Sequence, residues 1–321
     1  MQHLEPILAL RKWLAHQIIG QEALVDRLLI ALLSDGHLLV EGAPGLAKTK
    51  AIKTLASAIE GNFQRIQFTP DLLPSDITGT EIYRAQEGTF VFQEGPIFHN
   101  LILADEINRA PAKVQSALLE AMGERQVSHG RQTMALPPLF LVMATQNPIE
   151  QEGTYPLPEA QLDRFLVKID IFYPDRATER DILLATTGVK DDASVQVFSC
   201  DQLLAAQTLL RRMPVGDSVV ETILDLVRAF RPSDTNATEK VREKVAWGPG
   251  PRAAQALMLA VRARALLQGR LAPSIEDVIN MAQPVLSHRM ALNFSARARG
   301  DTLSDLIDET VTSFGHRETT A

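Results

Sequence analysis

The sequence is short of several residue types, and each shortage excludes a class of protein. Cys200 is the only cysteine among 321 residues, so neither an intrachain disulfide nor a cysteine cluster for a metal can form. The seven histidines are scattered without the spacing of metal ligands. No apolar run approaches about 18 residues, and the first residues lack a basic stretch followed by an apolar core. We therefore expect no signal peptide, no membrane insertion and a cytoplasmic location.

Positive charge is also in short supply. Lys and Arg number 32 against 39 Asp and Glu, which gives a net charge of −7. This balance argues weakly against a general nucleic-acid binder, although it leaves a local basic patch open. Apolar residues make up 45% of the chain, enough to fill a sizeable core in one large domain or two.

The most informative segment that is present is a glycine-bearing loop at residues 42–49. It follows an apolar run and opens a helical pattern, which is the phosphate-binding arrangement of P-loop nucleoside triphosphatases. Lys48 is expected to reach the β- and γ-phosphates, and the Thr49 hydroxyl to bind Mg²⁺. Ala47 stands where the general pattern has its second glycine, and its methyl group is tolerated there if the local φ is negative.

Two adjacent carboxylates, Asp105 and Glu106, end the apolar run 101–104. An aspartate at the end of a strand can hold Mg²⁺, usually through water, and the neighbouring glutamate can polarise a water for in-line attack on the γ-phosphate. Alone, such a pair is a common solvated strand end. Its position after a P-loop makes it a strong candidate for ATP hydrolysis.

Three further polar residues are weaker candidates. Asn147 follows the apolar run 141–144, and we expect it to orient the attacking water; turn formation before Pro148 is the alternative. Arg164 precedes the last expected strand. Its guanidinium group either points to the nucleotide of a neighbouring subunit or forms a salt bridge within its own chain. Arg252 opens a helix in the second half, from which its guanidinium could reach the γ-phosphate; a solvated helix start is the alternative.

Strands and helices alternate in the first half of the chain, and helices alone follow. Strands are expected at 37–41, 63–68, 101–105, 139–144 and 166–171, and helices at 22–33, 49–60 and 112–123. After a break at 173–175, helices are expected at 176–187, 200–212, 217–230, 251–268 and 274–286. The pattern predicts an α/β domain with a parallel sheet over residues 1–174 and a helical domain over 175–321.

Two segments, 79–95 and 125–136, interrupt the alternation and predict β-hairpins with turns at Glu87-Gly88 and His129-Gly130. They are either plain surface hairpins or loops inserted to engage a partner or the substrate.

Seven segments spread over nearly the whole chain resemble a known family. They lie at residues 18–21, 42–49, 68–79, 105–109, 147–148, 158–165 and 248–253. With them the chain is similar to AAA+ ATPases of the MoxR type, in which a small residue such as Ala47 is usual in the P-loop. The resemblance implies a P-loop AAA+ core with a parallel sheet and β-hairpin inserts, followed by an all-α lid domain.

The resemblance also implies ATP and Mg²⁺ as cofactors and assigns roles to residues. Binding of ATP is assigned to Ile18, Ile19 and Gly20 at the adenine and to Gly42, Ala43, Pro44, Gly45, Leu46, Ala47, Lys48, Thr49 and Lys50 at the phosphates. Thr49 and Asp105 bind the metal. Glu106, the sensor-1 residue Asn147, the arginine finger Arg164 and the sensor-2 residue Arg252 are the catalytic set. The two hairpins become the helix-2 insert and the pre-sensor-1 hairpin, facing the pore of a ring.

Three functions compete at this point. The first is a MoxR-like chaperone ATPase, a homo-hexamer that remodels or activates a client protein, often one with a von Willebrand factor A domain, in assembly or metal-cofactor insertion. The second is a nucleic-acid-translocating motor of the helix-2-insert group, which the net charge and the few basic residues of the first hairpin disfavour. The third is a non-catalytic scaffold that depends on a nucleotide. Nothing in the sequence supports a loss of activity, because the residues of the catalytic set are all present.

Overall fold

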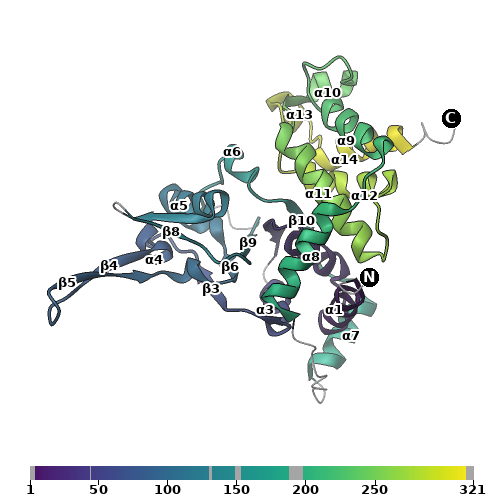
Figure 1. Cartoon of the computed structure of the whole chain (residues 1–321). Coiled ribbons are helices and arrows are strands. Elements are labelled where there is room, and N and C mark those ends of the chain that lie inside the picture. The colour runs from purple at the N-terminus through teal and green to yellow at the C-terminus, as the bar shows by residue number, and fades with distance from the viewer. Residues whose placement is uncertain (1–3, 44, 130–131, 149–152, 188–197, 316–321) are drawn as a thin grey trace.

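The computed structural model describes residues 4–43, 45–129, 132–148, 153–187 and 198–315 (Figure 1). At its centre lies a five-stranded sheet whose neighbours are all parallel, in the order β10-β1-β9-β6-β3. The strands are β1 (Leu38–Gly42), β3 (Phe63–Gln67), β6 (Leu101–Asp105), β9 (Leu141–Gln146) and β10 (Val167–Ile171). All five predicted strands are therefore confirmed, with bounds that differ by no more than two residues.

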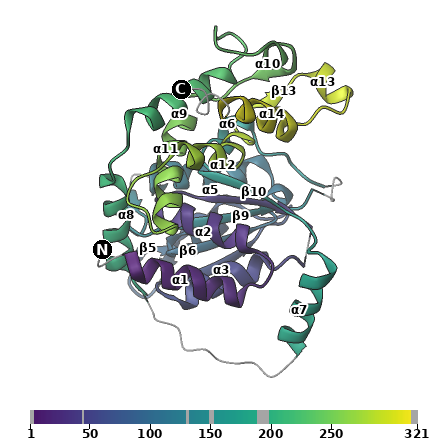
Figure 2. The ribbon, with the colours of Figure 1, turned by 90° about the vertical axis from the view of Figure 1, so that its right-hand side faces the viewer.

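The sheet is apolar on both faces because helices cover both. Along β6, Leu101 and Leu103 enter one core, whereas Ile102 and Ala104 enter the other. The first core includes residues of α1 (Leu4–Gln17), α2 (Glu22–Leu33) and α3 (Lys48–Ser57); the second includes residues of α4 (Pro74–Thr78) and α5 (Ala112–Glu124). Helices α1, α2 and α3 lie together in front of the sheet in Figure 2.

The predicted helix 49–60 is too long. Helix α3 ends at Ser57, and the next residues form β2 (Ile59–Glu60), which pairs in parallel with β11 (Phe198–Ser199). This pairing brings a segment from far along the chain against the end of α3, and its backbone hydrogen bonds replace the last helical turn. Local pattern carries no information about such a distant partner.

The second half is helical, as predicted. It contains α7 (Arg176–Thr187), α8 (Cys200–Arg212), α9 (Asp217–Ala229), α10 (Glu239–Lys244), α11 (Pro251–Leu267), α12 (Ile275–Leu286), α13 (Phe294–Ala298) and α14 (Leu303–Gly315), with a short antiparallel pair, β12 (Val245–Trp247) and β13 (Ala291–Leu292). The remaining elements are α6 (Glu159–Leu162) and the 3₁₀ turns η1 (Pro96–Phe98) and η2 (Ile107–Arg109).

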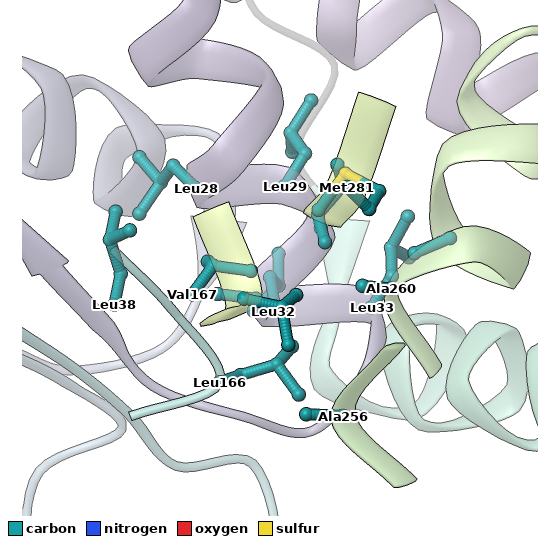
Figure 3. Close-up of a cluster of buried hydrophobic side chains, with 14 of the residues drawn as sticks. Leu28, Leu29, Leu32, Leu33, Leu38, Leu166, Val167, Ala256, Ala260 and Met281 are labelled. Carbon is teal, nitrogen blue, oxygen red and sulfur yellow. The ribbon is translucent and has the colours of Figure 1, made fainter. Parts of the chain in front are cut away.

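The helical half packs on the first half through a continuous apolar core. Figure 3 shows Leu29 and Leu33 of α2 near Ala260 of α11 and Met281 of α12, with Val167 of β10 in the same cluster. These side chains are almost completely buried, and each buried leucine contributes roughly 1.5–3 kcal/mol relative to exposure. Helix α2 therefore joins the sheet to the helical half, while the division near residue 174 stays a prediction.

Both predicted hairpins are confirmed. The first consists of β4 (Gly79–Arg84) and β5 (Thr89–Glu94), and it extends away from the rest of the molecule in Figure 1. The second consists of β7 (Gln126–His129) and β8 (Gln132–Ala135); Gly130, predicted in its turn, lies outside the described residues. On the first hairpin the rings of Tyr83 and Phe90 are 5.1 Å apart, and both are more than half exposed.

Candidate functional site

The loop between β1 and α3 has a conformation that the sequence prediction missed. Ala47 has φ 58° and ψ 13°, which is the left-handed region, so the expectation of a negative φ is wrong. A residue with a Cβ atom pays roughly 1–2 kcal/mol in this region. Gly45 also has a positive φ, of 85°. The backbone therefore makes the turn that the general pattern assigns to glycine. Pro44 lies outside the described residues.

Lys48 begins α3 and is held at the end of β1. Its side-chain Nζ donates a hydrogen bond to the carbonyl oxygen of Gly42 at 2.6 Å. Burial lowers the pKa of Lys48, and the nearby carboxylates of Asp105, Glu106 and Glu41 partly oppose that shift. A partly buried ammonium group among carboxylates is stabilised further by an anion, so the position suits a phosphate ligand.

Thr145, which sequence reasoning did not single out, bridges the two carboxylate residues. Its hydroxyl donates to Asp105 Oδ1 at 2.6 Å and accepts from the backbone N–H of Glu106 at 2.9 Å. Thr145 is fully buried on β9, the neighbour of β6. Glu106 itself has φ 56°, a left-handed conformation that is uncommon for a residue with a side chain. The pairing of β6 with β9 and the Thr145 hydroxyl hold the backbone of Glu106 in this conformation. The backbone conformation in turn sets the direction of the Glu106 side chain.

The carboxylate of Glu106 is held by two donors that were also missed. Gln67 Nε2 donates to Glu106 Oε2 at 2.8 Å, and Arg109 Nη1 donates to the same oxygen at 3.1 Å. Gln67 ends β3, where it lies opposite Asp105 in the parallel register. Gln67 could be assigned to the site from the sequence only if the order of strands in the sheet were known, because β3 and β6 are far apart along the chain.

A cavity of about 390 Å³ opens between these elements. It is lined by Gly45, Ala47, Lys48, Thr49, Lys50, Arg65, Asp105, Glu106 and Asn147. The fold therefore brings together eight of the residues predicted for the nucleotide site and adds Arg65. The side chain of Asn147 is buried, and this residue also lines an adjoining cavity of about 550 Å³ with Glu41 and Asn108.

The donor set of the smaller cavity fits a magnesium ion. Thr49 and Asp105 offer a hydroxyl and a carboxylate, the oxygen ligands that Mg²⁺ prefers, and one or two protein ligands suffice when phosphates and waters complete the octahedron. Within the described part of the chain, no three His, Cys, Asp or Glu side chains gather as a metal site.

Arg164 lies outside this cavity. Its Nη1 donates to the Leu119 carbonyl oxygen of α5 at 2.6 Å. A Cβ atom on Gly123 would lie only 1.9 Å from the same nitrogen, so the glycine in α5 leaves the space that the guanidinium occupies. The guanidinium group therefore binds a backbone carbonyl of its own chain and does not line its own chain's phosphate cavity, and its role at a neighbouring subunit stays a prediction.

Arg252 also lies outside the cavity, at the start of α11. Its Nη1 is 3.8 Å from Asp163 Oδ2, and 67% of its side chain is exposed. Asp163 accepts a second, closer bond of 2.7 Å from Nε of Arg289, a buried arginine that sequence reasoning missed. Arg289 also bonds the carbonyl oxygens of Phe165 and Leu166. The helical half therefore fixes the segment that carries Arg164.

The residues predicted for adenine binding are not among those that line the phosphate cavity. The Ile18 side chain is buried in the core just after α1, and Ile19 is half-buried. Gly20 has φ 75°, and a Cβ atom there would meet Thr178 of α7 at 2.1 Å. Gly42, Ala43 and Leu46 belong to β1 and the loop but do not line the cavity. Their roles stay predictions.

Two family models match separate parts of the chain. The family model described as "ATPase family associated with various cellular activities (AAA)" matches residues 37–167, and the model of the AAA lid domain matches residues 237–310. A crystallographically solved protein from Cytophaga hutchinsonii superposes with a TM-score of 0.89 at 41% identity, covering 97% of this chain and 94% of that protein.

Two named relatives match most of the sequence. Chaperone MoxR1 of Mycobacterium tuberculosis is 49% identical over 88% of this chain and 74% of that protein. Protein MoxR of Paracoccus denitrificans is 31% identical over 89% of this chain and 88% of that protein. Among the helices of the described residues, none is long and apolar enough to cross a membrane.

Proposed function

This chain belongs to the MoxR family of AAA ATPases, and we propose that it hydrolyses ATP with Mg²⁺ to remodel or activate a client protein. One observation carries the proposal: Lys48, Thr49, Asp105, Glu106 and Asn147 all line one cavity. They come from the ends of two neighbouring strands, β6 and β9, and from the start of α3, which is an arrangement that suits phosphoryl transfer.

Each side chain has a role in this proposal. Lys48 places its charge on the β- and γ-phosphates, and Glu106 polarises the attacking water that Asn147 helps to orient. Thr49 and Asp105 hold the Mg²⁺, which neutralises charge that develops on the phosphates. Ile18, Ile19 and Gly20 line the adenine end, and the loop from Gly42 to Lys50 cradles the phosphates through its backbone.

Lys48→Ala tests the nucleotide site directly. The substitution removes the cation from the phosphate position, so ATP binding and turnover should both be lost. Lys53→Ala is the matched control, because Lys53 is exposed on the same helix and does not line the cavity. Nucleotide affinity, measured with a fluorescent ATP analogue, should fall for Lys48→Ala alone. Equal affinity in the two variants would refute this assignment.

We further propose a homo-hexameric ring in which Arg164 acts on the nucleotide of the neighbouring subunit. Arg164 and Arg252 both lie outside their own chain's cavity, and this placement supports action across a subunit interface. Arg164→Ala should bind ATP and hydrolyse it poorly. Mixing it with Glu106→Gln should restore part of the turnover, because some interfaces then combine an intact Glu106 with an intact Arg164. A monomeric ATPase whose specific activity is independent of concentration would contradict the ring.

The proposed client is a protein, with a von Willebrand factor A domain as the first candidate and assembly or metal-cofactor insertion as the result. The β4–β5 hairpin supports a protein over a nucleic acid, because Ile82, Tyr83 and Phe90 are exposed on it. Its two strands and turn contain three acidic residues and one basic residue, whereas a phosphate backbone attracts basic ones. We place this activity in the cytoplasm, where ATP is supplied. Capture with ATP-loaded Glu106→Gln should retain the client, and salt-sensitive DNA binding instead would favour the motor.

A further inference from the structure

Arg65 is bonded to the carboxylate of Asp105, the candidate metal ligand. Its Nε and Nη2 atoms both donate to Asp105 Oδ2, at 3.1 and 2.6 Å. The other oxygen, Oδ1, accepts the Thr145 hydroxyl. Both oxygens of the candidate metal-binding carboxylate are therefore engaged, and Oδ2 is bonded to the guanidinium group of Arg65, a residue that also lines the cavity.

We infer that Arg65 competes with Mg²⁺ for Asp105 and thereby sets how strongly nucleotide binding depends on the metal. The inference rests on the proposed nucleotide site. The Asp105 side chain is 13% exposed, whereas that of Arg65 is 48% exposed. The carboxylate is thus fixed by its surroundings, while the long arginine side chain can move into solvent when a divalent cation takes its place.

The same guanidinium also connects Asp105 to Glu106. Arg65 Nη2 donates to Gln67 Oε1 at 2.7 Å, and Gln67 Nε2 donates to Glu106 Oε2 at 2.8 Å. Arg65 therefore orients the amide that holds Glu106. Its release from Asp105 removes a donor from Gln67, so arrival of the metal loosens the restraint on the glutamate. Arg65 acts through Asp105 and Gln67 and is a positioning residue.

The charges in the cavity determine whether the loss of Arg65 raises or lowers the affinities for nucleotide and for Mg²⁺. Arg65 adds positive charge beside Lys48 and Lys50, so it favours a metal-free polyphosphate and disfavours a second cation at Asp105. Replacing it with a neutral residue should weaken nucleotide binding in EDTA and strengthen the response to Mg²⁺. By thermodynamic linkage, the two effects are one coupling between metal and nucleotide.

The test compares Arg65→Gln with wild type by the fluorescence of mant-AMPPNP, a non-hydrolysable ATP analogue, in EDTA and during Mg²⁺ titration. The half-saturating Mg²⁺ concentration should fall about tenfold in Arg65→Gln, because both bonds from the half-exposed guanidinium group to Asp105 are lost. Arg65→Lys, which keeps the charge, should stay within about threefold of wild type. Arg228→Gln is the control, since the Arg228–Asp234 pair has matching exposure, 51% and 12%.

An unchanged or higher half-saturating Mg²⁺ concentration in Arg65→Gln would overturn the inference while leaving the nucleotide site intact. An equal fall in Arg65→Lys would overturn it as well, because charge would then not be the cause. Failure of wild type to bind the analogue under all conditions would overturn the proposed function and this inference together. Circular dichroism establishes that each variant is folded before the titration.

Discussion

Thr145→Val should uncouple the two carboxylate residues with almost no change in side-chain shape. The hydroxyl makes two hydrogen bonds, one to the charged Asp105 carboxylate and one from the Glu106 backbone. A bond to a charged group contributes about 1.5–3 kcal/mol, and a buried N–H without an acceptor adds a desolvation cost. We therefore expect the free energy of unfolding to fall by about 2–4 kcal/mol, measured by denaturant unfolding.

Turnover of ATP should fall in the same variant, because Glu106 loses the bond that supports its left-handed backbone and Asp105 loses its orientation. Thr145→Ser is the matched control, since it keeps the hydroxyl and removes only a methyl group; it should restore most of the turnover. A Thr145→Val protein with unfolding free energy within about 0.5 kcal/mol of wild type would refute the assigned role of the hydroxyl.

Two further predictions concern buried titratable groups. Burial, with a further contribution from Arg125, lowers the pKa of His37 to about 3, so this imidazole is neutral in the folded chain and charged in the unfolded chain below about pH 6.5. The neutral His37 side chain therefore contributes its full stability above pH 6.5, and the free energy of unfolding falls by about 2 kcal/mol when the pH is lowered to 5. His37→Gln should remove this pH dependence of the free energy of unfolding, measured between pH 5 and 7. Asp277 is fully buried and accepts bonds from Arg270 at 2.7 and 2.8 Å and from Arg264, so Asp277→Asn should cost about 3–5 kcal/mol in thermal or denaturant unfolding. The adjacent Glu276→Gln, whose side chain is 77% exposed, should change stability by less than about 1 kcal/mol, and an equal loss in both variants would contradict this reasoning.

Much of the fold could be predicted because it is encoded locally. The central strands are near-continuous apolar runs that helices bury on both faces, and such runs are recognisable in a sequence. The P-loop and the Asp105-Glu106 pair are likewise contiguous, so the residues that line one side of the cavity could be named in advance. The alternation of strands and helices then predicted a parallel sheet, whose strand ends meet at one edge.

The rest depends on which segments become neighbours in space. Arg65 and Gln67 reach the site because β3 pairs with β6, and Thr145 reaches it because β9 pairs with β6 on the other side. These pairings form between segments that are distant along the chain, and no local period specifies them. The left-handed conformation of Ala47 was missed for a related reason: the surrounding loop imposes it against the preference of the residue itself.

Helix α1 and the last helix, α14, were also not predicted. The buried residues of α1 are Ile7, Leu10 and Leu14, which form a narrow apolar stripe. This stripe is recognised as a buried face only when the helix is seen to pack against α2 and α11. Arg164 and Arg252 were named from the sequence as candidate site residues. The direction of their side chains, however, depends on the packing of α5 and α11. Roles that depend on a second subunit cannot follow from either chain pattern or cavity alone.

Steady-state phosphate release by Glu106→Gln, with nucleotide affinity measured in parallel, tests the central claim most directly. The amide cannot polarise water, so turnover at saturating ATP and Mg²⁺ should fall at least about 100-fold, while affinity stays within about threefold of wild type. Glu124→Gln, at an exposed position at the end of α5, should change neither quantity. Full turnover in Glu106→Gln would contradict the proposed mechanism, because the chemistry would then not depend on the carboxylate that Gln67 and Arg109 hold at the cavity.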